Sequence, residues 1–338
     1  MEEQLKETLV ELKKQDNIYV VTVDQIIKKD FGPELWMVGK LIPEQSITAI
    51  TGIPGSYKTW LTLEIAKCVS QGSDFLGQFK TTKGNVLFLD KENHLRNIQK
   101  RLKLLGVQNL PIFYFSRAED FLIDKEKDYK SLVKAIDELN IKLVVFDSLV
   151  RIHSGDENNS RDIAKAMNAF RKITNRGATV IFIHHNRKEG IRTQSTTNSV
   201  RGSSDILAGI DCLLQISKPE KEKILGVNQA KLRQDESVEP FKVEICFSKE
   251  NDSMGFTYGG DFDSEESEVE EAKESAIEIL KDGTIKPGQE LTEILSENYS
   301  ITIINKALKE LEILGVIIKE RKAHNKYFFS LKILPENI

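Results

Sequence analysis

Eight consecutive residues, from Gly52 to Thr59 (GIPGSYKT), carry the clearest chemical signal in the chain. They follow a buried apolar run, SITAITG, and they precede a stretch with helical spacing. Backbone N–H groups between a strand and the first turn of a helix bind phosphate well, and a lysine there adds positive charge. The segment therefore predicts a phosphate-binding loop.

The segment matches the P-loop pattern G-x-x-x-x-G-K-[ST] except that Tyr57 replaces its second glycine. We expect Lys58 to reach the β- and γ-phosphates of ATP and the Thr59 hydroxyl to bind Mg²⁺. Tyr57 either requires a shift of the backbone or stacks near the nucleotide or a neighbouring subunit. A chance glycine turn is the alternative, which the strand and helix on either side disfavour. The residues expected to bind the nucleotide are Gly52, Ile53, Pro54, Gly55, Ser56, Tyr57, Lys58, Thr59 and Trp60.

Two acidic residues at strand ends complete the predicted chemistry. Asp147 ends the apolar run LVVFD, the position at which a Walker B carboxylate holds the Mg²⁺ shell together with Thr59. Ser148 follows it, so the carboxylate that activates water must come from elsewhere. Glu92, in VLFLDKEN, is our candidate, with Asp90 as the competing acid. The alternative for Glu92 is a solvated residue of a charged loop.

The elements that must position these residues alternate in type. Apolar runs at 46–52, 86–90, 143–147, 179–185 and 211–216 are separated by segments with helical spacing. This order predicts an α/β fold with a mostly parallel sheet and helices on both faces. After about residue 226, VNQAKLRQ and EPFKVEICFS indicate two antiparallel strands at the end of the sheet.

We divide the chain into an N-terminal helical segment (1–33), an ATPase core (34–248), an acidic linker (249–270) and a C-terminal domain (271–338). Three helices followed by a β-hairpin in the last segment are typical of a winged helix-turn-helix. The third helix would turn Ile304, Ala307, Leu308, Leu311 and Leu314 toward its core. Candidate DNA contacts on this domain are Lys306, Lys309, Arg321, Lys322 and Lys326. Docking of a protein, such as a replication partner, is the alternative use.

The composition and the net charge exclude several classes of protein. The chain has 338 residues, 40% of them hydrophobic, and a formal net charge of −4, which argues against a protein that coats nucleic acid with its whole surface. No run approaches the roughly 20 apolar residues of a membrane span, and the first residues do not resemble a signal peptide. We therefore expect a cytoplasmic protein without membrane contact. Its three cysteines, Cys68, Cys212 and Cys246, are expected to fill the core in reduced form.

Over about residues 34–250 the chain resembles the RecA/DnaB class of P-loop ATPases, and within it the hexameric plasmid replicative helicase (RepA-like, AAA-type) family. The segments that carry the resemblance are WMVGKLIPEQSITAITGIPGSYKT, VLFLDKENHLRNIQKRL, LVVFDSLVRI, VIFIHHNRK, SVRGSSDILAGID and NQAKLRQ.

The resemblance implies roles for further residues. Glu92 would orient or deprotonate the attacking water, and His184 or His185 would sense the γ-phosphate. Lys231, Arg233 or Arg201 would reach the γ-phosphate held by the next subunit, so the site would be complete only in a ring, expected to be a hexamer. The histidine pair is also compatible with a structural role, and Lys231 and Arg233 with the solvent side of a strand.

The resemblance also implies single-stranded DNA in a central channel, contacted by polar loops at 151–162 and 186–202. The second loop is basic and contributes Arg187, Lys188, Arg192 and Arg201. We therefore expect a ring helicase or translocase that acts in DNA replication. The alternatives are a recombination or repair ATPase that does not unwind DNA, and an ATP-gated regulator whose winged helix binds a duplex.

Overall fold

The computed structural model describes residues 22–115, 120–155, 159–185, 204–217, 223–248, 250, 252–261, 264–281, 283, 285–322 and 326–332. Contacts within the chain define a first unit that ends at Leu35 and a second that begins at Trp36. In the first unit, helix α2 (Val23–Ile27) starts at a capping box, because the Thr22 hydroxyl accepts the Gln25 N–H at 3.2 Å and the Gln25 side chain accepts the Thr22 N–H at 3.0 Å.

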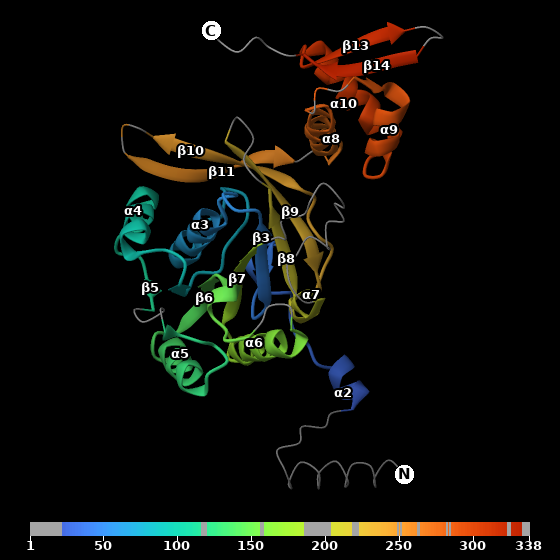
Figure 1. Ribbon diagram of the computed structural model, residues 1–338. Coiled ribbons are helices and arrows are strands. Elements are labelled where there is room, and N and C mark those ends of the chain that lie inside the picture. The colour runs from blue at the N-terminus through green and yellow to red at the C-terminus, as the bar shows by residue number, and fades with distance from the viewer. Residues whose placement is uncertain are drawn as a thin grey trace, which may run out of the picture. The chain divides into compact units, whose positions relative to one another are not determined.

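The main sheet of the second unit has nine strands in the part of the chain that is described, in the order β11-β10-β9-β8-β3-β7-β6-β4-β5. The six strands from β8 to β5 are parallel, and β9, β10 and β11 continue the sheet antiparallel (Figure 1). The expected α/β class is confirmed. The strands are β3 (Ile47–Gly52), β4 (Asn85–Asp90), β5 (Ile112–Tyr114), β6 (Ile141–Asp147), β7 (Thr179–His185), β8 (Cys212–Ile216), β9 (Ile224–Leu232), β10 (Phe241–Ser248) and β11 (Ser253–Asp261).

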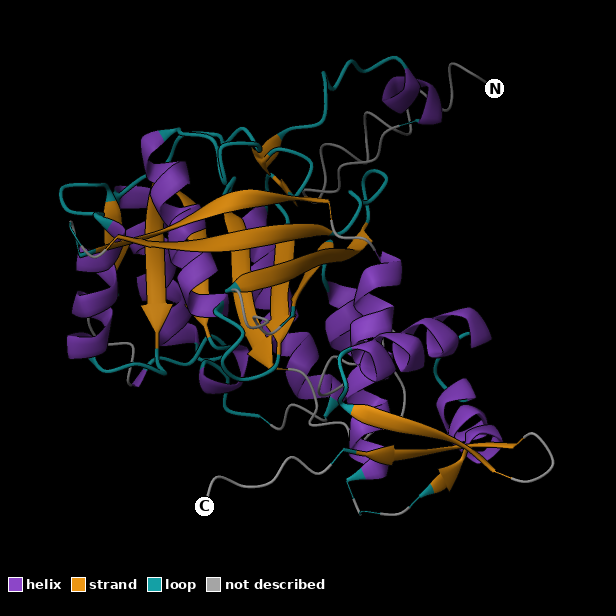
Figure 2. Cartoon of the chain, turned by 90° about the horizontal axis from the view of Figure 1, so that it is seen from above, coloured by secondary structure: helices purple, strands orange, loops and turns teal. Residues whose placement is uncertain are grey.

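Helices cover both faces of this sheet, as Figures 1 and 2 show. Successive strand residues point to opposite faces, so Val86 and Phe88 of β4 join one core cluster while Leu87 and Leu89 join the other. The first cluster lies under α3 (Lys58–Gln71) and α4 (Leu95–Leu105). The second lies under α5 (Glu126–Glu138), α6 (Ser160–Thr174) and α7 (Ser204–Gly209). Strands β1 (Trp36–Val38) and β2 (Ile42–Pro43) form a separate small antiparallel pair.

The acidic linker expected at 249–270 is wrong over most of its length. Residues 253–261 form β11, which pairs with β10 from Ser248↔Ser253 to Phe241↔Asp261. The Gly, Asp and Ser content of the segment favoured a loop, but Met254, Phe256 and Tyr258 alternate along it and pack on the first core cluster. The core therefore extends to Asp261, and helix α8 begins only a few residues later.

The C-terminal elements are α8 (Ser264–Leu280), β12 (Lys286–Pro287), α9 (Gly288–Ser296), α10 (Ile301–Ile313), β13 (Ile317–Lys322) and β14 (Lys326–Leu331). They have a hydrophobic core of their own. The order of three helices and a hairpin agrees with the expected elements, while the winged-helix interpretation stays a prediction. The prediction that Leu314 faces this core is wrong, because Leu314 follows the end of α10 and is 67% exposed.

Candidate nucleotide-binding site

The P-loop connects the carboxyl end of β3 to α3. Gly52 has φ 156°, and a Cβ there would collide with the Ile216 carbonyl oxygen and lie 2.7 Å from Ser56 Oγ. Gly55 has φ 84°, in the region that glycine adopts most readily. The Ser56 hydroxyl donates to the Ile53 carbonyl at 2.9 Å and closes the turn. Glycine is therefore required at position 52 and strongly favoured at position 55 by the path of the backbone.

Tyr57 stands where the motif has its second glycine and is the N-cap residue of α3. Its backbone is left-handed, with φ 59° and ψ 18°. A side chain in this region costs roughly 1–2 kcal/mol. The tyrosine ring packs against the core cluster that underlies α3, which offsets part of that cost. The loop thus keeps a glycine-like backbone conformation although a tyrosine stands at this position.

The Lys58 side chain is buried and contacts the backbone of its own loop. Its ammonium donates to the carbonyl oxygens of Gly52 (2.9 Å) and Ile53 (2.8 Å) and lies 3.4 Å from Ser56 Oγ. Burial lowers the pKa of Lys58, while the carboxylates of Asp147 and Glu92 oppose that shift. The positive charge is therefore held by the first residues of the loop, beside the cleft.

Thr59 and Asp147 meet as expected of a metal-binding pair. The Thr59 hydroxyl donates to Asp147 Oδ2 at 2.7 Å, although the two residues are 88 positions apart. Strand β7 lies between β3 and β6, and the register aligns Asp147 with Ile183 of β7 near the P-loop. Hydroxyl and carboxylate oxygens suit Mg²⁺, which uses few protein ligands beside water and phosphate. In the described residues no cluster of three or more His, Cys, Asp or Glu offers a metal cage.

The acidity of Asp147 leads to a testable pH dependence. Burial, reinforced by the nearby Asp90 carboxylate, raises the pKa of Asp147 to about 7. Metal binding requires the carboxylate, so a proton must leave below pH 7. Mg²⁺ affinity in the presence of ADP should therefore rise as the pH increases from 6 to 8. Titration calorimetry at several pH values measures this, and Asp147→Asn should remove most of the dependence; an unchanged slope in that variant would contradict the assignment.

Glu92 and Asp90 have different surroundings. Asp90 Oδ1 accepts the backbone N–H groups of Glu92 (3.0 Å) and Asn93 (2.9 Å), so its carboxylate shapes the turn after β4. Burial raises the pKa of Asp90 despite these bonds. Glu92 is exposed and lines the same cleft as the P-loop. This arrangement favours Glu92 over Asp90 as the residue that acts on water.

A cleft of about 590 Å³ joins these groups. The P-loop, Glu92 and Asp147 line it together with Lys223 and residues of β10 and β11. Sequence reasoning missed several of its lining residues, most of which lie on helix α4 or on the ribbon of β10 and β11, far from the P-loop in sequence. These residues are Asn93, Arg101, Leu104, Ile183, Lys223, Ile245, Phe247 and Met254. The alternation of Ile245 and Phe247 in the strand is the one signal that could have indicated the ribbon.

The histidine pair lies beside the P-loop strand. Thr51 pairs with His184 and Gly52 with His185 in the parallel register of β3 and β7. His184 is buried, at 2% exposure, and the side chain of His185 lies outside the described residues. The backbone therefore brings both positions next to the loop, while the role of sensing phosphate stays a prediction.

Lys231 and Arg233 lie at the opposite edge of the sheet from the P-loop of the same chain, because β9 runs antiparallel to β8 and Cys212 pairs with Leu232. The Lys231 ammonium donates to the carbonyls of Leu207 (2.6 Å) and Ile210 (2.8 Å) at the end of α7. Burial lowers the pKa of Lys231. Neither cation can serve the nucleotide site of its own chain.

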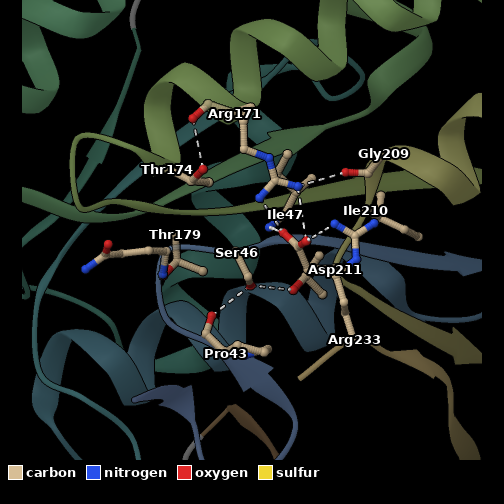
Figure 3. Close-up of polar contacts among 12 residues, drawn as sticks. Pro43, Ser46, Ile47, Arg171, Thr174, Thr179, Gly209, Ile210, Asp211 and Arg233 are labelled. Carbon is tan, nitrogen blue, oxygen red and sulfur yellow. Dashed lines mark hydrogen bonds and ion pairs between the residues drawn. The ribbon is translucent and has the colours of Figure 1, made fainter. Parts of the chain in front are cut away.

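Arg233 belongs to a buried ionic cluster centred on Asp211 (Figure 3). Asp211 is 4% exposed at its side chain and pairs with Arg171 (2.8 Å) and Arg233 (3.0 Å). Its Oδ2 also accepts the Ile47 N–H at 2.9 Å, which ties the cluster to the start of β3. The cluster therefore links α6 and the adjoining ends of β8 and β9 to β3, the strand that leads into the P-loop.

Removing the charge at the centre of this cluster should destabilise the core. Asp211→Asn leaves two guanidinium groups without their carboxylate, and because both are partly exposed to solvent, at 38% and 49%, we expect a loss of about 1–3 kcal/mol. Urea unfolding measures the loss. The control is Asp137→Asn in the exposed pair with Arg176, where the change should stay within about 1 kcal/mol. Equal, small effects in both variants would argue against a structural role for the cluster.

Most DNA-contact candidates cannot be placed. Arg187, Lys188, Arg192 and Arg201 lie outside the described residues, as do the side chains of Lys322 and Lys326. Lys306, Lys309 and Arg321 are exposed, as expected for α10 and the hairpin. Glu310 and Glu312, which weaken the case for DNA, are engaged by lysines of the same unit: Glu310 accepts from Lys273 at 2.8 Å and Glu312 lies 4.0 Å from Lys319.

The cysteines only partly follow the expectation. Cys68 and Cys212 are buried, and burial raises their pKa values to about 11 and about 12. Cys246 is exposed on β10 and is not core filler, because its strand lies near the edge of the sheet. In the described part of the chain, no helix is long and apolar enough to cross a membrane.

Comparison with known proteins places the chain in a broad context. The sequence profile described as AAA domain matches residues 8–190, more than half of the chain. A DnaB-like replicative helicase is 16% identical with a TM-score of 0.49, over 74% of this chain and 70% of that chain. A KaiC-like protein of Pyrococcus horikoshii is 14% identical (TM-score 0.44, 63% and 90%), and the RadB recombinase is 16% identical (0.43, 62% and 90%). No curated protein sequence matched the chain.

Proposed function

Since this chain belongs to the AAA domain family, we propose that it binds ATP with Mg²⁺ and hydrolyses it as a RecA-like P-loop motor. The single observation that carries the proposal is the bond between Thr59 Oγ1 and Asp147 Oδ2, 2.7 Å long, in the cleft that also holds Lys58. Two neighbouring residues of the P-loop and a carboxylate 88 positions away thereby form the minimum set for a metal-bound nucleotide phosphate.

The chemistry is divided among the chain's own groups. The loop amides and Lys58 bind the β- and γ-phosphates, and Thr59 and Asp147 would hold Mg²⁺, which would neutralise phosphate charge. Glu92 orients a water molecule toward the γ-phosphorus and takes its proton. The new bond joins the water oxygen to phosphorus, the bond to the β-γ bridging oxygen breaks, and ADP leaves with that electron pair.

We further propose that the motor is a ring, with a hexamer as the first expectation, acting as a helicase or translocase on single-stranded DNA. The resemblance of the segments around Glu92, Asp147, the histidine pair and Lys231 to the plasmid helicase family supports this proposal. The position of Lys231 and Arg233 is compatible with it, because they lie at the opposite edge of the sheet from their own P-loop and any contact with a nucleotide would have to be made in another copy.

Steady-state ATP hydrolysis, with and without single-stranded DNA, tests the proposal. Strong stimulation by DNA would support a motor and justify a strand-displacement assay, which separates a helicase from a recombination or repair ATPase. Hydrolysis that ignores single-stranded DNA but accompanies a footprint on one duplex sequence would favour the ATP-gated regulator, with exposed Lys306 and Lys309 of α10 as candidate contacts. Absence of hydrolysis would overturn the enzymatic proposal.

A cation shared between subunits predicts complementation. Arg233→Ala should be inactive alone, and mixing it with Glu92→Gln should restore part of the hydrolysis, because some interfaces would then contain both an intact Glu92 and an intact Arg233. Because Arg233 also pairs with Asp211, the melting temperature of the variant must be measured alongside. Failure of every mixing ratio to restore hydrolysis, in a variant that remains folded, would refute a role for Arg233 across the interface.

A further inference from the structure

Arg101 of α4 is a cleft residue that neither the P-loop motif nor the acidic residues account for. It lines the same 590 Å³ cleft as Lys58, Thr59 and Asp147. Its guanidinium carbon lies 5.5 Å from the centroid of the Trp60 ring, so the group is held over an aromatic face of α3. A rigid helix and a stacked ring therefore position this cation beside the metal-binding pair.

The guanidinium is not fully satisfied by the protein. Arg101 Nη1 is buried and donates no hydrogen bond to any residue in the described part of the chain. Leaving such a donor unpaired costs about 1–3 kcal/mol, and folded proteins rarely accept this cost without a reason. An acceptor that is not part of the chain is the simplest reason, and an anion suits a cleft that also holds Lys58.

The surrounding charges support the same conclusion. Burial raises the pKa values of Asp90 and Asp147, and the Arg101 charge opposes that rise, but no ion pair joins Arg101 to either carboxylate in the described part of the chain. Its Nη1 donor is therefore not taken up by these carboxylates. A planar guanidinium fits two oxygens of a phosphate better than any other side chain.

We propose that Arg101 is a catalytic residue, an intrachain cation that binds the γ-phosphate and stabilises the charge that develops while water attacks it. The proposal rests on the proposed ATP hydrolysis and adds a residue to it. Arg101 stays charged at any working pH and transfers no proton. It donates hydrogen bonds to the γ-phosphate oxygens, while the proton of water goes to Glu92 and ADP departs as described above.

This assignment differs from that of Lys231 and Arg233. Those two cations contact Asp211 and carbonyls at the end of α7, at the opposite edge of the sheet from their own P-loop. A role in hydrolysis would therefore place them at the nucleotide of another copy. Arg101 is in the same chain as the P-loop that it faces. Each chain thus supplies part of the stabilisation of the charge that develops at its own γ-phosphate, with or without a second copy of the protein.

The test uses the full chain with Arg101→Gln, Arg101→Lys and, as control, Lys100→Ala, which removes one positive charge from the exposed side of α4. For Arg101→Gln we expect kcat to fall about 10³-fold or more, as with other arginines that contact a transferred phosphoryl group. The affinity for ADP and the melting temperature should remain those of the wild type. Binding of ADP with aluminium fluoride, which imitates the transition state, should be lost, and Arg101→Lys should recover part of kcat.

Several outcomes would overturn the inference. If Arg101→Gln keeps its kcat, or loses ADP affinity and melting temperature in step with kcat, the residue only balances the charge of nearby carboxylates. If mixing Arg101→Gln with Glu92→Gln restores hydrolysis, Arg101 acts on another copy. Failure of the proposed function is distinguishable, because the wild-type protein would then hydrolyse no ATP, whatever the residue at 101.

Discussion

Glutamine at position 92 should lower kcat for ATP hydrolysis by about 10²–10⁴-fold, the usual contribution of a general base. ATP and ADP affinity should change little, because Glu92 is exposed in the cleft and the loop amides and Lys58, which bind the phosphates, are left unchanged. Glutamine keeps the length and the polar end of the side chain but cannot take a proton. Single-turnover hydrolysis and fluorescent-nucleotide binding measure the two quantities separately.

Asp90→Asn is the matched comparison, since Asp90 is the competing acid. The amide oxygen of asparagine can still accept the N–H groups of Glu92 and Asn93 that Asp90 accepts at 3.0 and 2.9 Å. The turn should therefore persist, and kcat should fall by less than tenfold, about 1.4 kcal/mol in barrier height. A large loss in Asp90→Asn together with a small one in Glu92→Gln would exchange the two roles.

Much of the site could be predicted because P-loop chemistry is local. Gly52, Lys58 and Thr59 follow one another between a strand and a helix, so their proximity is set by a few backbone angles. The pairing of Thr59 with Asp147 needed only the rule that carboxyl ends of parallel strands share one edge of the sheet. The replacement at Tyr57 was visible in the sequence, but its φ of 59° was not.

Arg101 could not be distinguished by sequence from its neighbours. Helix α4 carries four cations, Arg96, Lys100, Arg101 and Lys103, and helical spacing alone does not tell which of them faces the cleft. The contact with Trp60 depends on how α3 and α4 pack on the sheet, a property of the whole fold. The same holds for Asp211, whose partner Arg171 is 40 residues away.

The edge of the sheet was the least predictable part of the fold. Strand β11 has Gly255, Gly259 and Gly260, a composition that local propensity assigns to a loop. Pairing with β10 and packing of Phe256 outweigh that propensity. The ribbon matters for function, because Phe247 and Met254 from it line the cleft opposite the P-loop.

Lys58→Ala should abolish detectable hydrolysis and weaken ATP binding by roughly 10²–10⁴-fold. Two charge-assisted hydrogen bonds to phosphate, at about 1.5–3 kcal/mol each, account for this loss. Isothermal titration with ATP and a sensitive phosphate-release assay measure the two effects. The variant should still fold, because the same change removes a buried charge whose pKa burial has already lowered.

Lys58→Arg separates charge from geometry in that prediction. The ammonium of Lys58 fits between the carbonyl oxygens of Gly52 and Ile53, at 2.9 and 2.8 Å, a space that a planar guanidinium does not match. Arginine should therefore fail almost as completely as alanine, although the charge is kept. Full activity in Lys58→Arg would mean that the phosphate site needs only positive potential, and the compact contact inferred from the loop geometry would be wrong. Loss of folding in both variants, seen by urea unfolding, would instead assign Lys58 a structural role in the loop.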